Sequence, residues 1–237
     1  MNKWTARRLA EFVEQTEVFD LAANLVVFRS QAVSGNLIPN IARQDPKIDT
    51  SDQESRVLDQ LKLFGASYLD HTDHTALDLL VRAQHFGLHT RLLDWTSNPL
   101  VALWFACSDC RLGGDAFVYA LTADDLQDEH VYFGDPFATS LTRIFQPRLN
   151  NPRIIAQHGW FSLHGYLKEA GEFVALNVNP DTKENLTEIR IPSDRRTDIL
   201  GSLDRHGINR RSLFPDLEGL CHYLNWKHKL CIAYQST

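Results

Sequence analysis

One short segment constrains the fold more than any other part of this chain. Residues 100–107 read Leu-Val-Ala-Leu-Trp-Phe-Ala-Cys, and they follow Asn98 and Pro99, a cap and a first-turn proline that predict a helix start. Because this helix is apolar on every side, we expect it to be buried. The segment before it, residues 82–96, is rich in charged and polar side chains. As that segment enters the core, its polar groups must be hydrogen-bonded to one another or to a ligand.

The composition is that of an ordinary globular protein. The chain has 237 residues, of which 43% are hydrophobic and 23% charged, enough to bury a sizeable core. The formal net charge of −6 argues against a wholly basic nucleic-acid binder, although a local basic patch remains compatible with it. No run of 18 apolar residues predicts a membrane span, and Met1–Glu14 does not read as a signal peptide. We therefore expect a cytoplasmic protein that folds as a single domain over residues 1–237.

The hydrophobic periodicity places helices early in the chain and strands later. Helical spacing predicts helices over 4–17, from Ser51 or Asp52 to 64, and from Asp73 to 85, with a loop over 34–50. Short apolar runs predict strands over 25–28, 116–121, 153–156, 160–163, 173–178 and 186–191. Two further helices, over 193–205 and 215–226, end the chain. This order predicts an α+β fold in which N-terminal helices pack on a mixed or antiparallel sheet.

The cysteines give little reason to expect a metal. Cys107 and Cys110 have C-x-x-C spacing, but the second pair that completes most structural zinc sites is missing. We expect two small buried side chains at a helix end, and we predict no metal.

Arg29 ends the first predicted strand, where its guanidinium needs a partner if it is buried. The planar fork of arginine suits a phosphate or a carboxylate, while the alternative is a side chain that reaches solvent or pairs internally.

Two further stretches have the polar density of a site. The first, residues 82–96, holds His85, Arg91, Asp94, Trp95 and Thr96, and its alternative reading is an internal Arg91–Asp94 pair that fixes a loop. The second, residues 151–164, places Gln157 and His158 between two apolar runs, and its alternative reading is a β-hairpin with an exposed polar turn. The motifs of P-loop hydrolases, Rossmann enzymes, serine hydrolases and zincin proteases are absent from the sequence.

Taken together, these segments resemble the FRG domain family. The Phe-Arg-Gly motif is met by Phe28-Arg29-Ser30, with serine in place of glycine. A long middle signature with the core T-R-L-L-D-W-T-x-N-P is matched from Ala83 to Ala106. A later pattern is met at Asn151, Arg153, Gln157, Gly159 and Phe161, and a terminal L-F-P-D-L-x-G-L at residues 213–220.

A weaker resemblance leads to the ADP-ribosyltransferases of the R-S-E type. They carry an arginine at the end of a first strand, then a Ser-Thr-Ser strand end followed by a helix. Residues 92–106 resemble that second element, with Thr96-Ser97 at its core. The third element is a strand glutamate; Gln157 stands in that setting, and Glu172 and Glu188 are the acidic alternatives.

The resemblance implies an NAD-binding enzyme that transfers ADP-ribose to an unknown protein or nucleic-acid acceptor, or hydrolyses NAD, with a toxin or antiphage-defence role. The implied catalytic residues are Arg29, His85, Thr96 and Gln157. The implied NAD contacts are Arg29, Ser30, Gln31, Arg91, Asp94 and Trp95, with Trp95 stacking on the ligand.

Two other functions remain open. One is a non-catalytic nucleotide or nucleic-acid recognition module, with a basic face interleaved with aromatic rings; its residues are Arg143, Arg148, Arg153, Arg195, Arg196, Arg210, Arg211, Phe145, Trp160 and Phe161. The other is a nuclease whose metal would be held by Asp70, Asp73, Asp94 and histidines.

Overall fold

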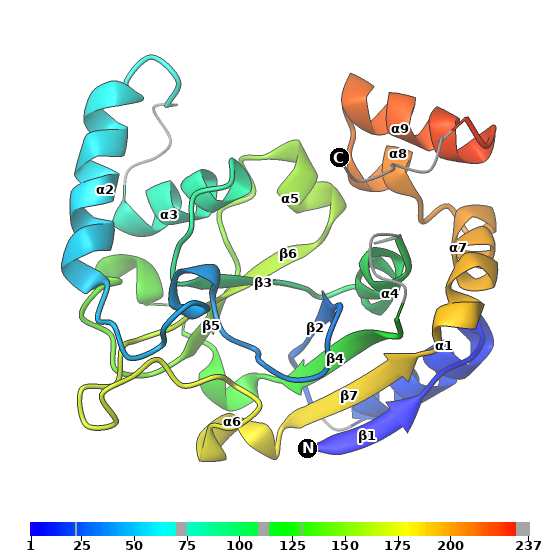
Figure 1. Cartoon of the computed structure of the whole chain (residues 1–237), viewed down its shortest axis with the longest axis horizontal. Coiled ribbons are helices and arrows are strands. Elements are labelled where there is room, and N and C mark those ends of the chain that lie inside the picture. Colours follow the sequence, from blue (N-terminus) through cyan, green and yellow to red (C-terminus); the bar gives the residue numbers. More distant parts are fainter. Residues whose placement is uncertain (22, 70–74, 109–113, 129, 231–237) are drawn as a thin grey trace.

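A mixed seven-stranded sheet forms the centre of the described structure (Figure 1). The computed structural model describes residues 1–21, 23–69, 75–108, 114–128 and 130–230. In spatial order the strands run β1-β7-β4-β2-β3-β6-β5. Their bounds are β1 (Asn2–Thr5), β2 (Val26–Gln31), β3 (Leu92–Thr96), β4 (Ala116–Thr122), β5 (Arg143–Phe145), β6 (Gly159–Leu163) and β7 (Leu186–Ile191). Only the β1–β7 pair among them is parallel.

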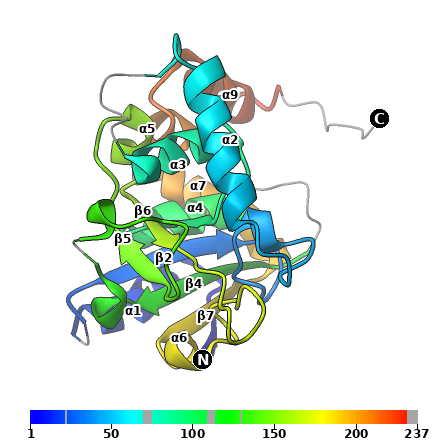
Figure 2. The same cartoon turned by 90° about the vertical axis from the view of Figure 1, so that its left-hand side faces the viewer.

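Most of the helices gather on one face of this sheet, as Figure 2 shows for α2, α3, α4 and α7. The helices are α1 (Leu9–Glu17), α2 (Ser51–Phe64), α3 (Ala76–His85), α4 (Pro99–Ser108), α5 (Pro152–Ala156), α6 (Pro180–Lys183), α7 (Arg196–Arg205), α8 (Arg210–Leu213) and α9 (Leu217–Lys227). Short 3-10 turns cover 18–21, 40–42, 124–126, 131–133 and 193–195. Helices on a mixed sheet confirm the predicted combination of elements.

The apolar helix α4 lies in the core, as its sequence predicts. Leu103 is fully buried, and the helix packs against Phe28 of β2, Val118 of β4 and Ile189 of β7. The Asn98 side chain accepts a hydrogen bond from the Leu100 amide at 3.0 Å, which is the predicted cap. Since α4 follows β3 directly, its burial fixes the end of β3 inside the molecule.

The opposite face of the sheet is covered by loops. Val27, Tyr119 and Leu121 lie on that face, and Leu37 and Leu176 from two loops pack onto them. The side chain of Arg29 lies on this face too, because it is two residues from Val27 and pairs in register with Tyr119.

The sheet is split in its middle. β2 pairs with β4 over six residues and β3 pairs with β6 over five, whereas β2 and β3 share only the Phe28–Thr96 pair. Strands β1, β7, β4 and β2 therefore form one half of the sheet, and strands β3, β6 and β5 form the other. Arg29 and Asp94 face each other across the split.

Several sequence predictions are wrong. Residues 153–156 form helix α5, not a strand, because Asn151 caps it by accepting from the Arg153 amide and Pro152 occupies its first turn. Consequently no hairpin surrounds Gln157; a helix ends there, and His158 turns the chain into β6 with a positive φ of 49°.

Two other predicted elements differ as well. Residues 173–178 form no strand, and Phe173 and Leu176 are instead buried beneath loops. The predicted helix over 4–17 begins only at Leu9, because Asn2–Thr5 pair with β7 as an edge strand.

Cys107 is buried at the end of α4, and burial raises the pKa of its thiol to about 12, so it is an unreactive neutral side chain. Cys110 and the predicted helix cap Asp73 lie outside the described residues. The described ranges contain no group of three or more side chains placed to hold a metal ion. They also contain no helix with the length and apolar character needed to cross a membrane.

Candidate functional site

Arg29 bridges the two halves of the sheet at the split. Its Nη1 donates to the Asp94 carbonyl oxygen at 2.6 Å and lies 3.7 Å from the Asp94 carboxylate. Its side chain is 14% exposed, and its Nε is buried without a hydrogen-bond partner among the described residues. Burial lowers the pKa of Arg29 to about 10, which Asp94 partly offsets, so the guanidinium stays charged at neutral pH.

Arg43 places a second positive charge close to Arg29. It follows the 3-10 turn at 40–42, is exposed, and its charge contributes to the lowered pKa of Arg29. Two neighbouring guanidinium groups repel each other, and a bound anion would relieve that repulsion. Sequence reasoning missed Arg43 because it lies in a loop with no motif of its own.

A buried histidine, His164, lies close enough to Arg29 to be affected by its charge. His164 is enclosed, and burial together with the charges of Arg29 and Arg91 lowers its pKa to about 3, so it is neutral. Its Nε2 lies 2.9 Å from the Ser162 hydroxyl, which in turn accepts from the indole N–H of Trp95 at 2.9 Å. The sequence pattern did not predict this chain of contacts, because Trp95 and Ser162 lie 67 positions apart.

Asp94 is the exposed carboxylate at the split. Its side chain is 62% exposed, and its Oδ1 accepts from the Gln84 side-chain amide at 2.7 Å. The Gln84 carbonyl oxygen accepts from the Thr90 hydroxyl in turn. Asp94 is therefore oriented by α3 on one side and by Arg29 on the other, while its carboxylate still faces solvent.

Thr96 and Gln157, two of the implied catalytic residues, lie together, and their contacts are with the protein. The Thr96 hydroxyl donates to the Gln157 backbone carbonyl at 2.7 Å and accepts from the Asn98 amide at 3.0 Å. The Gln157 side chain donates to the Leu213 carbonyl at 3.1 Å. These bonds tie the end of β3 to α5 and α8, so both residues position the site.

Arg91 does not pair with Asp94. It is fully buried, and its guanidinium binds Glu54 of α2, with Nη2 at 2.8 Å and Nε at 3.1 Å from Oε1. Trp95 is also buried, and its indole ring packs among apolar side chains under the sheet. In this structure the two residues build the core beneath the split.

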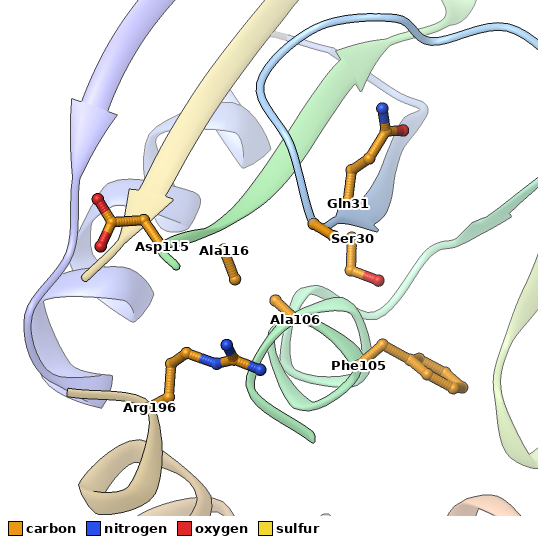
Figure 3. Close-up of a pocket in the computed structure, with 8 residues that line it drawn as sticks. Ser30, Gln31, Phe105, Ala106, Asp115, Ala116 and Arg196 are labelled. Atoms are coloured by element: carbon orange, nitrogen blue, oxygen red, sulfur yellow. The ribbon is translucent and has the colours of Figure 1, made fainter. Parts of the chain in front are cut away.

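Ser30 and Gln31 follow Arg29 at the end of β2 and line a small pocket beside α4 (Figure 3). Its volume of about 110 Å³ is below the roughly 300 Å³ at which small-molecule sites begin. Figure 3 shows the Arg196 guanidinium reaching toward α4, where it donates to the Cys107 carbonyl, while Asp115 points away and pairs with Arg190. We assign this pocket a structural role.

Of the two acidic alternatives, Glu188 lies on the same face as Arg29. The register places Tyr119 between them, opposite Arg29 on one side and Glu188 on the other. Glu188 is buried, and its carboxylate accepts from the hydroxyls of Tyr119 and Ser34, both at 2.6 Å, and pairs with Lys3 at 3.2 Å. Those hydrogen bonds lower its pKa against the effect of burial. Glu172 lies in a loop.

His85 lies next to Gln84 at the end of α3 but borders a separate cavity of about 190 Å³ between α3 and residues 147–154. Burial, Arg153 and Arg82 lower the pKa of His85, and Asp94 raises it. In the last turn of α3, Gln84 is thus bonded to Asp94 at the split, whereas His85 lines the separate cavity.

The predicted basic and aromatic face is not assembled as expected. Phe145 and Phe161 are buried and stack on each other at 5.9 Å, so they offer no surface to a base. Arg196 is buried as well, and Arg153 pairs with Asp216 at 2.6 Å.

Comparison with known proteins places residues 24–112 within a described family, since they match the profile of the FRG domain. These residues are similar to the FRG domain. No curated protein and no solved structure matches the chain. The FRG match spans β2 to α4 and includes Arg29, Arg43, Gln84 and Asp94, so the split and the groups around it lie within it.

The terminal signature at residues 213–220 lies outside the matched range, but the structure explains its glycine. The Gly219 amide donates to the Asp216 side chain at 2.7 Å and starts α9. A Cβ at this position would lie 2.1 Å from the Phe214 carbonyl oxygen, so only glycine fits here, in the first turn of α9 against the end of α8.

Proposed function

We propose that this protein binds NAD at the β2–β3 split and breaks its nicotinamide–ribose bond, as an ADP-ribosyltransferase-like enzyme or an NAD hydrolase. The observation that carries the proposal is the contact of Arg29 with the exposed Asp94 at a break in the sheet, with the charge of Arg43 acting on the same guanidinium. A dinucleotide needs cations for its pyrophosphate and an anion beside the ribose carbon that becomes positive. The split offers both kinds of group.

Arg29 and Arg43 would hold the pyrophosphate. The bond to the Asp94 carbonyl uses Nη1 of Arg29, and its Nε has no partner among the described residues, so it is a donor for a phosphate oxygen. The Asp94 carbonyl bond and the surrounding burial orient the guanidinium before a ligand arrives, which reduces the entropy lost on binding.

Asp94 would supply the negative charge. When the bond between nicotinamide N1 and ribose C1′ breaks, its electron pair leaves with neutral nicotinamide and the ribose becomes an oxocarbenium-like cation. A carboxylate held near C1′ stabilises that cation. The acceptor, or water in hydrolysis, then forms the new bond to C1′ and loses a proton. Gln84 and Thr90 would keep the carboxylate oriented.

The proposal is tested by thermal unfolding with millimolar NAD and by chromatography of released nicotinamide, with biotinylated NAD added to cell lysate to detect labelled protein or nucleic acid. A ligand at 100 times its Kd stabilises by about 2.7 kcal/mol, which moves the midpoint by several degrees. We expect this shift in the wild type, and a much smaller one in Arg43→Gln, which leaves the Arg29–Asp94 contact in place.

Asp94→Asn separates binding from chemistry. Asparagine keeps the acceptor for Gln84, so the NAD shift should remain while nicotinamide release falls by roughly a hundredfold. Asp59→Asn, at an exposed aspartate of α2, is the matched control and should change neither result. No shift in the wild type would refute the NAD site. A shift without release or labelling would leave a recognition module for the nucleotide.

A further inference from the structure

A second polar cavity lies beside the site described above. Its volume is about 190 Å³, and α3, Tyr132 and residues 147–154 line it. The charged and polar side chains around it include Arg148, His85, Asn150 and Asn151, with Arg82 donating to the Tyr68 carbonyl at its rim. Because whole small-molecule sites begin at roughly 300 Å³, this cavity suits one phosphate with part of the group that carries it.

Arg148 is the best-placed anion ligand of the cavity. Its Nη1 donates to the buried carboxylate of Asp78 at 3.1 Å, and its guanidinium lies 5.1 Å over the ring of Tyr132. Asp78 is fixed in turn, since it accepts from the amide and the hydroxyl of Thr75 in the capping box of α3. The guanidinium is therefore fixed by Asp78 at one nitrogen and by the Tyr132 ring against its plane, while the side chain is still 46% exposed.

That arrangement leaves the bidentate edge of Arg148 available. With Nη1 bonded to Asp78, the remaining Nε and Nη2 donors form the edge that fits two oxygens of a phosphate, and neither makes a hydrogen bond among the described residues. The N–H of the neutral His85 ring and the side-chain amides of Asn150 and Asn151 add donors around the same cavity. Asn151 uses its carbonyl oxygen to cap α5, so its NH₂ group is the part left for a ligand.

The cavity also has aromatic walls. Phe86, 76% exposed, and Tyr132 both line it, and each offers a ring beside the polar groups. An exposed ring next to a phosphate fork and to amides is the combination that holds a nucleotide unit, because every base has a face for stacking and an edge for amide hydrogen bonds.

From these contacts we propose that the cavity bordered by Arg148, His85 and Phe86 binds a nucleotide unit, with its phosphate on Arg148 and its base against Phe86. This site is separate from the β2–β3 split, because the last turn of α3 lies between them, with Gln84 bonded to Asp94 and His85 on the cavity. The proposal does not depend on NAD turnover. The nucleotide unit comes either from a free mononucleotide or from single-stranded nucleic acid.

The test is equilibrium binding of the four ribonucleoside 5′-monophosphates, of the parent nucleosides, and of a mixed-sequence single-stranded RNA of twelve nucleotides. We expect the phosphate to strengthen binding by about 10-fold to 100-fold over the nucleoside, as hydrogen bonds to charged groups do. Arg148→Gln should remove that preference, and Arg148→Lys, which keeps the charge but loses the fork, should restore only part of it. Phe86→Ala should weaken nucleoside and nucleotide by the same factor, about fivefold or more.

Arg195→Gln is the matched control, because Arg195 is 47% exposed and paired with an aspartate but lines no part of this cavity. It should leave every affinity unchanged. Tighter binding of RNA than of any monophosphate, with the same loss in Arg148→Gln, assigns the site to nucleic acid, and the reverse order assigns it to free nucleotides. Equal binding of nucleoside and nucleotide, or full affinity in folded Arg148→Gln and Arg148→Lys, would overturn the proposal.

Discussion

The Arg91–Glu54 pair carries the sharpest stability prediction, through the substitution Glu54→Gln. Both side chains are buried, and the guanidinium also donates to the Ser51 hydroxyl and to the Pro136 carbonyl. Glu54 accepts from the Arg91 amide at 3.1 Å and from the Thr50 hydroxyl at 2.9 Å. Glutamine has one acceptor oxygen where Glu54 uses two, so it keeps only one of these neutral contacts, and it leaves the Arg91 charge buried without a counter-ion.

Removal of one partner of a buried ion pair costs about 3–5 kcal/mol. For a chain of this size, each kcal/mol lowers the unfolding midpoint by about 2–4 °C, so Glu54→Gln should lower it by about 6–20 °C. Urea unfolding followed by circular dichroism measures the free energy. Asp59→Asn, on the exposed side of the same helix, should stay within about 0.5 kcal/mol of the wild type.

The double variant Glu54→Gln/Arg91→Met completes the test. Once the buried cation is gone, the missing counter-ion no longer matters, so the double variant should be more stable than the sum of the single losses by at least about 1 kcal/mol. A loss below about 1 kcal/mol in Glu54→Gln, or strict additivity, would refute the view that Arg91 is a structural cation. NAD stabilisation that disappears in both variants lacking Arg91, but persists in Glu54→Gln, would return Arg91 to the ligand site.

Three further outcomes are expected. Because burial beside two arginines lowers the pKa of His164 to about 3, unfolding at acid pH takes up a proton; stability should fall from pH 6.5 downward, by about 2 kcal/mol at pH 5, and urea unfolding of His164→Gln should show a flatter pH profile. Iodoacetamide at pH 8 should label exposed Cys221 while buried Cys107 stays unmodified in mass spectra, and equal labelling would contradict its raised thiol pKa. Gly219→Ala should be strongly destabilised in thermal unfolding, because its methyl group meets the Phe214 carbonyl; an unchanged midpoint would show that the turn can shift.

Local sequence signals predicted the elements whose ends are marked by capping residues or proline. The cap at Asn98 and the apolar run after it predicted α4 within one residue at each end. The same combination of a cap and a proline occurs at Asn151-Pro152, where it starts α5. A strand was predicted there instead, because the β-branched Ile154 and Ile155 favour one. The edge strand Asn2–Thr5 could not be predicted, because its partner lies more than 180 residues away on β7.

The candidate site shows the same limit. Arg29 and Asp94 were both recognised as unusual, yet their contact joins residues 65 positions apart, and no single sequence fixes such a pairing. Arg91 was an implied NAD contact because it stands in the middle signature, but its partner Glu54 lies on a helix 37 positions earlier. The role of a charged residue in such a motif thus depends on the residue it pairs with, and that residue can be identified only from the folded structure.

The break between β2 and β3 is the place where the fewest backbone pairs join neighbouring strands of the described sheet. Each half is held by a ladder of backbone pairs, whereas between the halves the backbone contributes only the Phe28–Thr96 pair, and the Arg29 side chain adds its bond to Asp94 above a shared apolar core. The backbone hydrogen bonds between strands are insensitive to salt, whereas the contacts of the Arg29 guanidinium weaken when an anion binds it. Hydrogen exchange at β3 amides should therefore report the occupancy of Arg29, while the amides of β4 and β7 stay protected throughout.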